Sequence, residues 1–154
     1  MVTFIEITQL SEFLAEKGIP FVLTGTSALS FYGLLPKDYE VGDIDIIITP
    51  SDADASLHIE NELTSLAKLT GGVSDDYDGK SFTFYFGSHR VKVNAIMQRQ
   101  DMMVKYLKVL NGNYPVLNIH TPDEALKAKF SLHRIKDYTF CNSLITTITS
   151  YFNK

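Results

Sequence analysis

The chain has 154 residues, a size that fits one domain with a substantial hydrophobic core. Its composition, 45% hydrophobic and 21% charged, is that of an ordinary globular protein and argues against disorder. The formal net charge of -4 argues against strong binding to duplex DNA, because phosphate backbones are bound by clustered Lys and Arg. Cys141 is the only cysteine, which excludes an intramolecular disulfide and disfavours a cysteine-based zinc site.

No segment is typical of a signal peptide or of a membrane span. Glu6 and Glu12 place negative charge near the N-terminus, and the apolar runs have the length of strands. We therefore expect a cytoplasmic protein that has no membrane partner.

Hydrophobic periodicity predicts most of the elements in chain order. Ile5, Leu10 and Leu14 recur at helical spacing before Gly18, and a short apolar run then indicates a buried strand. Taken along the whole chain, the pattern predicts helices over residues 3–17, 27–34, 52–68, 121–132 and 136–152. It predicts strands over residues 21–23, 43–49, 81–86, 90–97 and 116–119.

The connections complete this prediction. Gly87-Ser88-His89 joins two β-rich runs and indicates a hairpin, whereas residues 74–79 form a polar loop. Residues 101–110 are compatible with a helix, and residues 111–113 with a turn. We expect one domain over residues 1–154, of the α/β (α+β) class, with a mixed sheet flanked by helices.

The first pattern that indicates chemistry is Asp43-Ile44-Asp45 inside an apolar strand. Side chains two residues apart on a strand point to the same face, so the two carboxylates lie together. Two like charges at this distance repel unless a cation lies between them, and Mg²⁺ prefers such oxygen ligands. The alternative is a solvated strand end that tolerates two acids.

The second pattern is Gly25-Thr26-Ser27, which follows the first buried strand and opens a helix. Glycine permits close backbone approach, and free N–H groups at a helix start attract phosphate oxygens. This pattern alone fits a plain connection equally well. The informative feature is its place about 20 residues before Asp-x-Asp.

The combination resembles the nucleotidyltransferase superfamily, whose minimal fold is like that of DNA polymerase beta. Residues 23–29, Leu-Thr-Gly-Thr-Ser-Ala-Leu, and residues 42–46, Gly-Asp-Ile-Asp-Ile, are similar to its two motifs. Residues 121–129 and 134–137 are similar to the tail of bacterial abortive-infection and toxin–antitoxin nucleotidyltransferases. The resemblance covers residues 21–137 and implies a nucleotidyltransferase-like fold with nucleotide binding at Gly25, Thr26 and Ser27.

One position departs from that family. The resemblance implies a third acid on the strand around residues 91–96, and this chain has Asn94 there. An amide can ligate a metal weakly or orient water, but it cannot act as a general base. The tail departs as well, because Thr139 and Phe140 stand where a further acid is common.

The basic and imidazole side chains give weaker signals. Lys129, Lys136 and Arg134 are candidates for phosphate contact, with Lys129 preferred because the resemblance places a lysine there. A solvated helix face explains such lysines equally well. We expect three histidines to lie at the surface rather than to bind a metal, namely His89, His120 and His133.

Two functions and one structural alternative follow. The leading hypothesis is a Mg²⁺-dependent enzyme that transfers a nucleoside monophosphate from an NTP to a hydroxyl of a small molecule, protein or RNA. In it Asp43 and Asp45 hold the metal, and Asn94 in place of an acid weakens catalysis. The second hypothesis is a degenerate, non-catalytic domain that binds a nucleotide or a partner, as an antitoxin or regulatory module does. The third is a structural domain whose motifs are coincidental.

Overall fold

The computed structural model of the chain describes residues 2–35, 39–75, 80–98, 104–111 and 114–130. Within these ranges the helices are α1 (Phe4–Glu16), α2 (Gly25–Phe31), α3 (Ala53–Thr70) and α4 (Pro122–Phe130). The strands are β1 (Phe21–Thr24), β2 (Asp43–Ile48), β3 (Val73–Asp75), β4 (Lys80–Phe86), β5 (Val91–Met97), β6 (Tyr106–Asn111) and β7 (Tyr114–His120). The helix expected over residues 136–152 lies outside the described residues.

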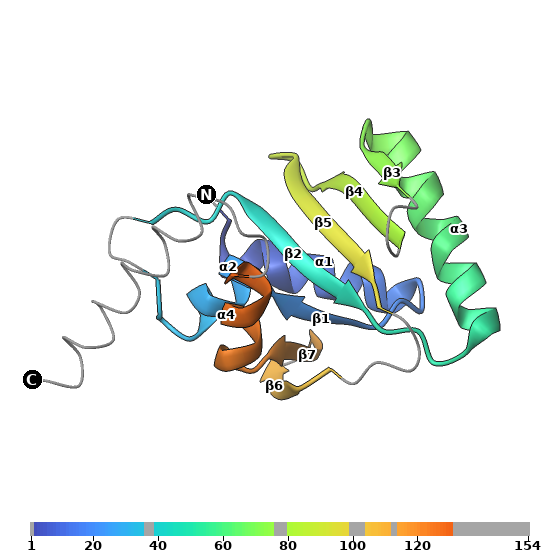
Figure 1. Ribbon diagram of the computed structural model, residues 1–154. Helices are drawn as coiled ribbons and strands as arrows, with labels where there is room; N and C mark the ends of the chain where they lie inside the picture. The colour runs from blue at the N-terminus through green and yellow to red at the C-terminus, as the bar shows by residue number, and fades with distance from the viewer. Residues whose placement is uncertain (1, 36–38, 76–79, 99–103, 112–113, 131–154) are drawn as a thin grey trace, which may run out of the picture.

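The strands form one mixed sheet in the order β3-β4-β5-β2-β1-β7-β6. The pairs β2–β5 and β1–β7 are parallel, and the other neighbouring pairs are antiparallel. Helices flank this sheet (Figure 1), so the predicted α+β class is confirmed. The sheet brings β2 beside β5 although α3, β3 and β4 separate them in sequence.

The two faces of the central strands differ in burial. On β2, three isoleucines are fully buried and alternate with partly exposed residues, the buried ones being Ile44, Ile46 and Ile48. This buried face packs against α1 and α3. The ring of Phe13 on α1 lies 5.3 Å from that of Phe86 on β4 in a tilted arrangement, and the Ser56 hydroxyl of α3 donates to Met97 Sδ of β5. Each fully buried Leu or Ile contributes about 1.5–3 kcal/mol relative to an exposed one. Because the isoleucines occupy this face of β2, the residues that alternate with them lie on the opposite face.

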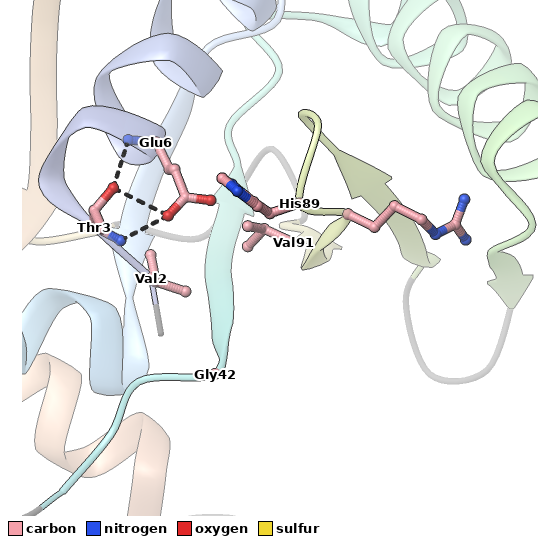
Figure 2. Close-up of a pocket in the computed structure, with 7 residues that line it drawn as sticks. Val2, Thr3, Glu6, Gly42, His89 and Val91 are labelled. Atoms are coloured by element: carbon pink, nitrogen blue, oxygen red, sulfur yellow. Dashed lines mark hydrogen bonds between the residues drawn. The ribbon is translucent and has the colours of Figure 1, made fainter.

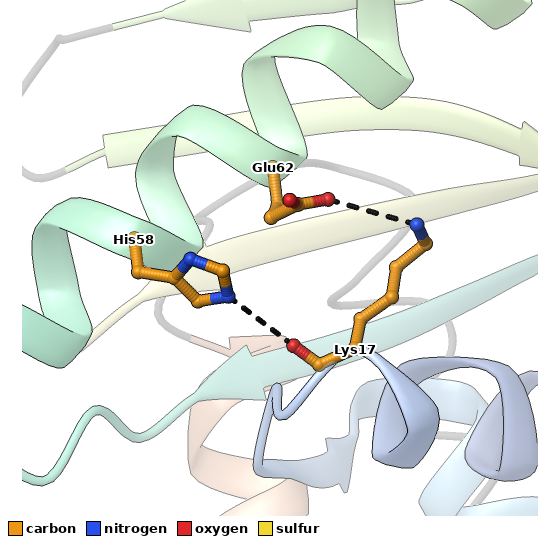
Figure 3. Close-up of polar contacts among 3 residues, drawn as sticks. All are labelled: Lys17, His58 and Glu62. Atoms are coloured by element: carbon orange, nitrogen blue, oxygen red, sulfur yellow. Dashed lines mark hydrogen bonds and ion pairs between the residues drawn. The ribbon is translucent and has the colours of Figure 1, made fainter.

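The two covering helices also contact each other directly (Figure 3). Lys17, the C-cap residue of α1, forms an ion pair with Glu62 of α3, with 3.6 Å between Nζ and Oε2. The carbonyl oxygen of Lys17 lies 3.4 Å from His58 Nε2. The ion pair is partly exposed and stabilises the fold by at most about 1 kcal/mol. Its position shows that α1 and α3 cover the same face.

The structure corrects two predictions. Residues 106–111 form strand β6, not the end of a helix, and they pair with β7 in an antiparallel hairpin. Residues 73–75 form the short edge strand β3, where a polar loop was predicted over residues 74–79. In both places a short segment takes its conformation from the strand beside it, which local periodicity does not encode.

In the described ranges, no helix has both the length and the apolar character needed to cross a bilayer.

Candidate functional site

Asp43 and Asp45 lie on the face of β2 that faces away from the isoleucine core. Both are partly exposed, whereas the alternating isoleucines have no exposed surface. The alternation follows from the two-residue period of a strand. The two carboxylates therefore project to the same side, as their spacing predicted.

Asn94 of β5 lies on this face directly beside them. It is the Cα partner of Asp45 in the parallel β2–β5 pair. Its amide nitrogen donates to Asp45 Oδ1 at 3.1 Å and to Asp43 Oδ2 at 3.5 Å. Its amide oxygen accepts from the hydroxyl of Thr83 on β4 at 3.4 Å. Both carboxylates thus converge on one atom of Asn94.

Gly25 closes the other side of Asp45. Its φ of +62° is in the left-handed region, which favours glycine. A Cβ atom at this position would stand 2.7 Å from Asp45 Oδ2 and 3.3 Å from Asp45 Cβ. Glycine is therefore required both by the backbone conformation and by the close approach of the Asp45 side chain.

Ser27 joins α2 to β2. Its hydroxyl accepts a hydrogen bond from the backbone N–H of Asp45 at 3.0 Å and donates to the carbonyl oxygen of Thr24 at 3.2 Å. The residue is only 1% exposed. The hydroxyl thus positions Asp45 from within the fold. Thr26, with 8% of its surface exposed, borders the cavity described below.

His120 continues the site toward β7, and it is buried rather than at the surface, which corrects the prediction for this histidine. Its Nδ1 lies 2.7 Å from the Thr24 hydroxyl, and its carbonyl oxygen accepts from the Tyr32 hydroxyl at 2.7 Å. Burial lowers the pKa of His120, against the opposing effects of Glu124 and Asp123. Burial also raises the pKa of Tyr32, and Asp123 adds to that shift.

These contacts form a row across the sheet, which we call the polar row: His120, Thr24, Asp45, Asn94 and Thr83. Consecutive pairs are either Cα partners in the sheet or joined by a side-chain hydrogen bond. The row crosses β7, β1, β2, β5 and β4. It places the candidate site at the centre of the sheet.

A cavity of about 560 Å³ opens over the middle of this row, where Thr24, Asp45 and Asn94 line it. Its lining includes Asp43, Asp45 and Asn94, the Gly25 turn, and Ala128 of α4. The volume falls within the range of small-molecule sites, about 300–1,000 Å³. Tyr39, Ser81 and Ile96 also border it.

Lys92 is the one lysine or arginine among the described lining residues, and sequence reasoning missed it. It is the Cα partner of Asp43 and is exposed. The signal that could have found it is its place two residues before Asn94, which puts both side chains on one face of β5. The described lining therefore contains two carboxylates and one ammonium group.

The other predicted cationic residues contribute no described side chain. Lys129 lies in the last turn of α4, but its side chain is outside the described part, and Arg134 and Lys136 lie outside the described residues altogether. Whether any of them reaches the cavity therefore stays a prediction.

A smaller pocket of about 370 Å³ lies at Gly42, just before β2 begins (Figure 2). It lies between the start of α1, the start of β2 and the β4–β5 turn, and its lining includes His89 and Arg90. The Glu6 carboxylate at its edge accepts hydrogen bonds from the backbone N–H and the hydroxyl of Thr3, which caps α1. Of the polar side chains drawn there, those of Thr3 and Glu6 serve the helix cap.

The donor set at the polar row partly fits a divalent cation. Within the described ranges, no three His, Cys, Asp or Glu side chains come together in a metal-binding group. The carboxylates of Asp43 and Asp45 do converge on the side chain of Asn94. The amide oxygen of Asn94 is itself a ligand of the kind that hard cations bind. Asp43, Asp45 and Asn94 are thus the described residues that could hold Mg²⁺.

Comparison of the sequence with protein-family models gave no match, and comparison with curated proteins gave none either. The resemblance to nucleotidyltransferases therefore depends on the motifs alone.

Proposed function

We propose that the chain binds a nucleoside triphosphate together with Mg²⁺ in the cavity over the polar row. It transfers the nucleoside monophosphate to an acceptor hydroxyl, and pyrophosphate leaves as the α–β phosphoanhydride bond breaks. The observation that carries this proposal is the convergence of Asp43 and Asp45 on one point beside the Gly25 turn. The cavity volume is sufficient for a nucleotide.

Charge supports the involvement of a cation. The described lining has two carboxylates and one lysine, an arrangement that would repel a triphosphate without added positive charge. Mg²⁺ would supply that charge and would stabilise the transferring phosphoryl group. In this arrangement Gly25 and Thr26 border the phosphates, and the Lys92 ammonium group attracts them.

Asn94 makes the proposed transfer slow. A third carboxylate would accept the proton of the attacking hydroxyl, a contribution of typically 10²–10⁴-fold, and an amide cannot do so. We therefore expect binding to be retained better than turnover.

A second candidate, a non-catalytic nucleotide- or partner-binding domain, is favoured by one specific observation. The amide nitrogen of Asn94 donates to both carboxylates, so part of their repulsion is relieved without a metal. Under this alternative the protein binds a nucleotide or partner and never transfers.

Thermal unfolding with each NTP, with and without Mg²⁺, tests the proposed binding. A ligand specific for the folded state raises the melting temperature by mass action. The Asp43→Asn/Asp45→Asn variant should lose this rise, because its side chains keep their shape but not their charge. The matched control, Glu12→Gln/Glu16→Gln, removes the same charge from exposed positions on α1. Equal rises in all three proteins would place binding elsewhere and overturn the proposal.

Transfer itself is measured with NTPs radiolabelled on the α-phosphate against a panel of hydroxyl acceptors. Slow labelling of an acceptor that needs Asp43 and Asp45 supports the enzyme. Mg²⁺-dependent binding without labelling, with labelling gained in the Asn94→Asp variant, supports the non-catalytic alternative.

A further inference from the structure

Both ends of the Asn94 carboxamide are engaged in a directional arrangement. The amino group faces the carboxylates of Asp45 and Asp43, at 3.1 and 3.5 Å, and the oxygen faces the Thr83 hydroxyl at 3.4 Å. An amide nitrogen has no free lone pair for a metal ion, whereas the amide oxygen does. In this orientation Asn94 presents the wrong end of its side chain to a cation.

We propose that the Asn94 carboxamide turns end for end when a divalent cation enters between the carboxylates, and that Thr83 is the positioning residue for both orientations. This inference rests on the proposed function. In the turned state the amide oxygen faces the cation, and the amino group donates to Thr83 Oγ1. The threonine hydroxyl changes from donor to acceptor, a role that every hydroxyl can take.

The surroundings permit this rotation without rebuilding the sheet. The two ends of a carboxamide are nearly equal in size, so the turn keeps the occupied volume. The backbone at Thr83 is held on both sides, because β4 pairs with β3 and β5. It is also packed closely against Gly72, where an added Cβ would stand 1.8 Å from the carbonyl oxygen of Thr83. The Thr83 hydroxyl therefore stays within reach of residue 94.

The rotation has a consequence for affinity. Before the cation binds, it must displace the two hydrogen bonds that the Asn94 amide donates to the carboxylates. In a variant with aspartate at residue 94, these hydrogen bonds do not exist. We expect Mg²⁺ to bind the Asn94→Asp variant at least tenfold more tightly than the natural protein.

Magnetic resonance of the ¹⁵N-labelled chain, residues 1–154, tests the rotation without any activity measurement. The Asn94 side-chain NH₂ signal is assigned by its absence from the Asn94→Asp variant. Under Mg²⁺ titration, with no nucleotide present, this signal should shift together with the backbone signals of Asp43 and Asp45. A nuclear Overhauser contact between the NH₂ group and the Thr83 methyl group should strengthen as Mg²⁺ saturates the site.

Thr83→Val removes the hydroxyl that receives the turned amino group, and in the present orientation it removes only a long contact of 3.4 Å. The turned state therefore loses more, and Mg²⁺ affinity should fall several-fold. Thr83→Ser, which keeps a hydroxyl, should restore the affinity. In the Asn94→Asp background Thr83→Val should change Mg²⁺ affinity much less, because no amide remains to be turned. An equal loss in both backgrounds would show a merely structural role for Thr83 and would overturn the assignment.

The remaining outcomes separate this inference from the proposed function. Shifts at Asp43 and Asp45 with an unchanged NH₂ signal would overturn the rotation and leave the proposed function standing. Binding of Mg²⁺ by the Asn94→Asp variant alone would overturn the rotation and identify Asn94 as a block to the cation. No response in either protein would overturn both.

Discussion

The Asp45 carboxylate lies against Gly25 so closely that a methyl group at residue 25 would stand 2.7 Å from Oδ2. The motif glycine and the motif aspartate therefore form one packed unit, joined further by the Ser27 hydroxyl. Substitutions in the turn should consequently act on the carboxylate as well as on the backbone.

Gly25→Ala tests this unit. The left-handed φ of +62° costs a non-glycine residue about 1 kcal/mol, and the clash with Asp45 adds to that loss of stability. Gly18→Ala is the matched control, because Gly18 has a φ of +70° and no atom within 4 Å of the added Cβ. Chemical denaturation should show a clearly larger loss for Gly25→Ala. Equal losses would contradict the packed unit.

Ser27→Ala should destabilise the fold by about 1–3 kcal/mol, since it leaves the backbone N–H of Asp45 without its hydroxyl acceptor. Ser30→Ala, at an exposed position on the same helix, is the control and should change stability by less than about 0.5 kcal/mol. Urea unfolding of both variants provides the comparison. A neutral Ser27→Ala would speak against the positioning role.

Lys92→Gln should weaken the binding of Mg²⁺–NTP by about tenfold, the effect of losing one charge-assisted contact to phosphate. Binding is measured by calorimetry at fixed ionic strength, because exposed charges are screened by salt. Lys108→Gln, at an exposed position on β6, controls for the change in net charge. If the two variants lose affinity equally, Lys92 has no specific role.

His120 should make stability depend on pH. Its pKa is lowered in the folded protein by burial, so the unfolded chain binds the proton more readily below the ordinary pKa of about 6.5. Stability is therefore fully present above that value and falls as the pH decreases below it. His120→Gln should show a smaller loss of stability between pH 7 and pH 5 than the natural protein. Parallel pH profiles for the two proteins would contradict this assignment.

Asn94→Asp should lower stability in the presence of a chelator by about 2 kcal/mol. It replaces a donor to two carboxylates by a third negative charge on the same face. Added Mg²⁺ should recover most of that loss. Thermal unfolding with and without Mg²⁺ measures both effects, and a variant as stable as the natural protein in chelator would show that the amide bonds contribute little.

The spacing of apolar residues along the chain predicted those helices and strands in which the buried side chains recur with one clear period. The isoleucine alternation of β2 gave both the strand and the shared face of Asp43 and Asp45, and the apolar spacing of α1 gave its extent. The run Tyr106-Leu107-Lys108-Val109 is too short for its period to separate helix from strand, and its pairing with β7 decided the conformation.

The rest of the site depends on contacts that no local pattern contains. His120 carries no sign of burial in its own neighbourhood, because its cover comes from Thr24 and Tyr32 far away in the chain. Lys92 was overlooked because its importance comes from its parallel partner Asp43 across the sheet. The position of Asn94 was expected only through resemblance, and its direct bonds to both acids required the register of β2 against β5.

The polar row also has a consequence for how the molecule assembles. Its central contact, Asp45 to Asn94, joins residues 49 positions apart, and Thr24 to His120 joins residues 96 positions apart. Contacts of such long range form slowly, because the intervening chain must first be ordered. Asn94 can therefore reach the two carboxylates of β2 only after α3, β3 and β4 have folded and placed β5 beside β2. During refolding, recovery of the cation site should trail the hairpin signal of β4 and β5, which makes the site a reporter of a folding stage later than that hairpin.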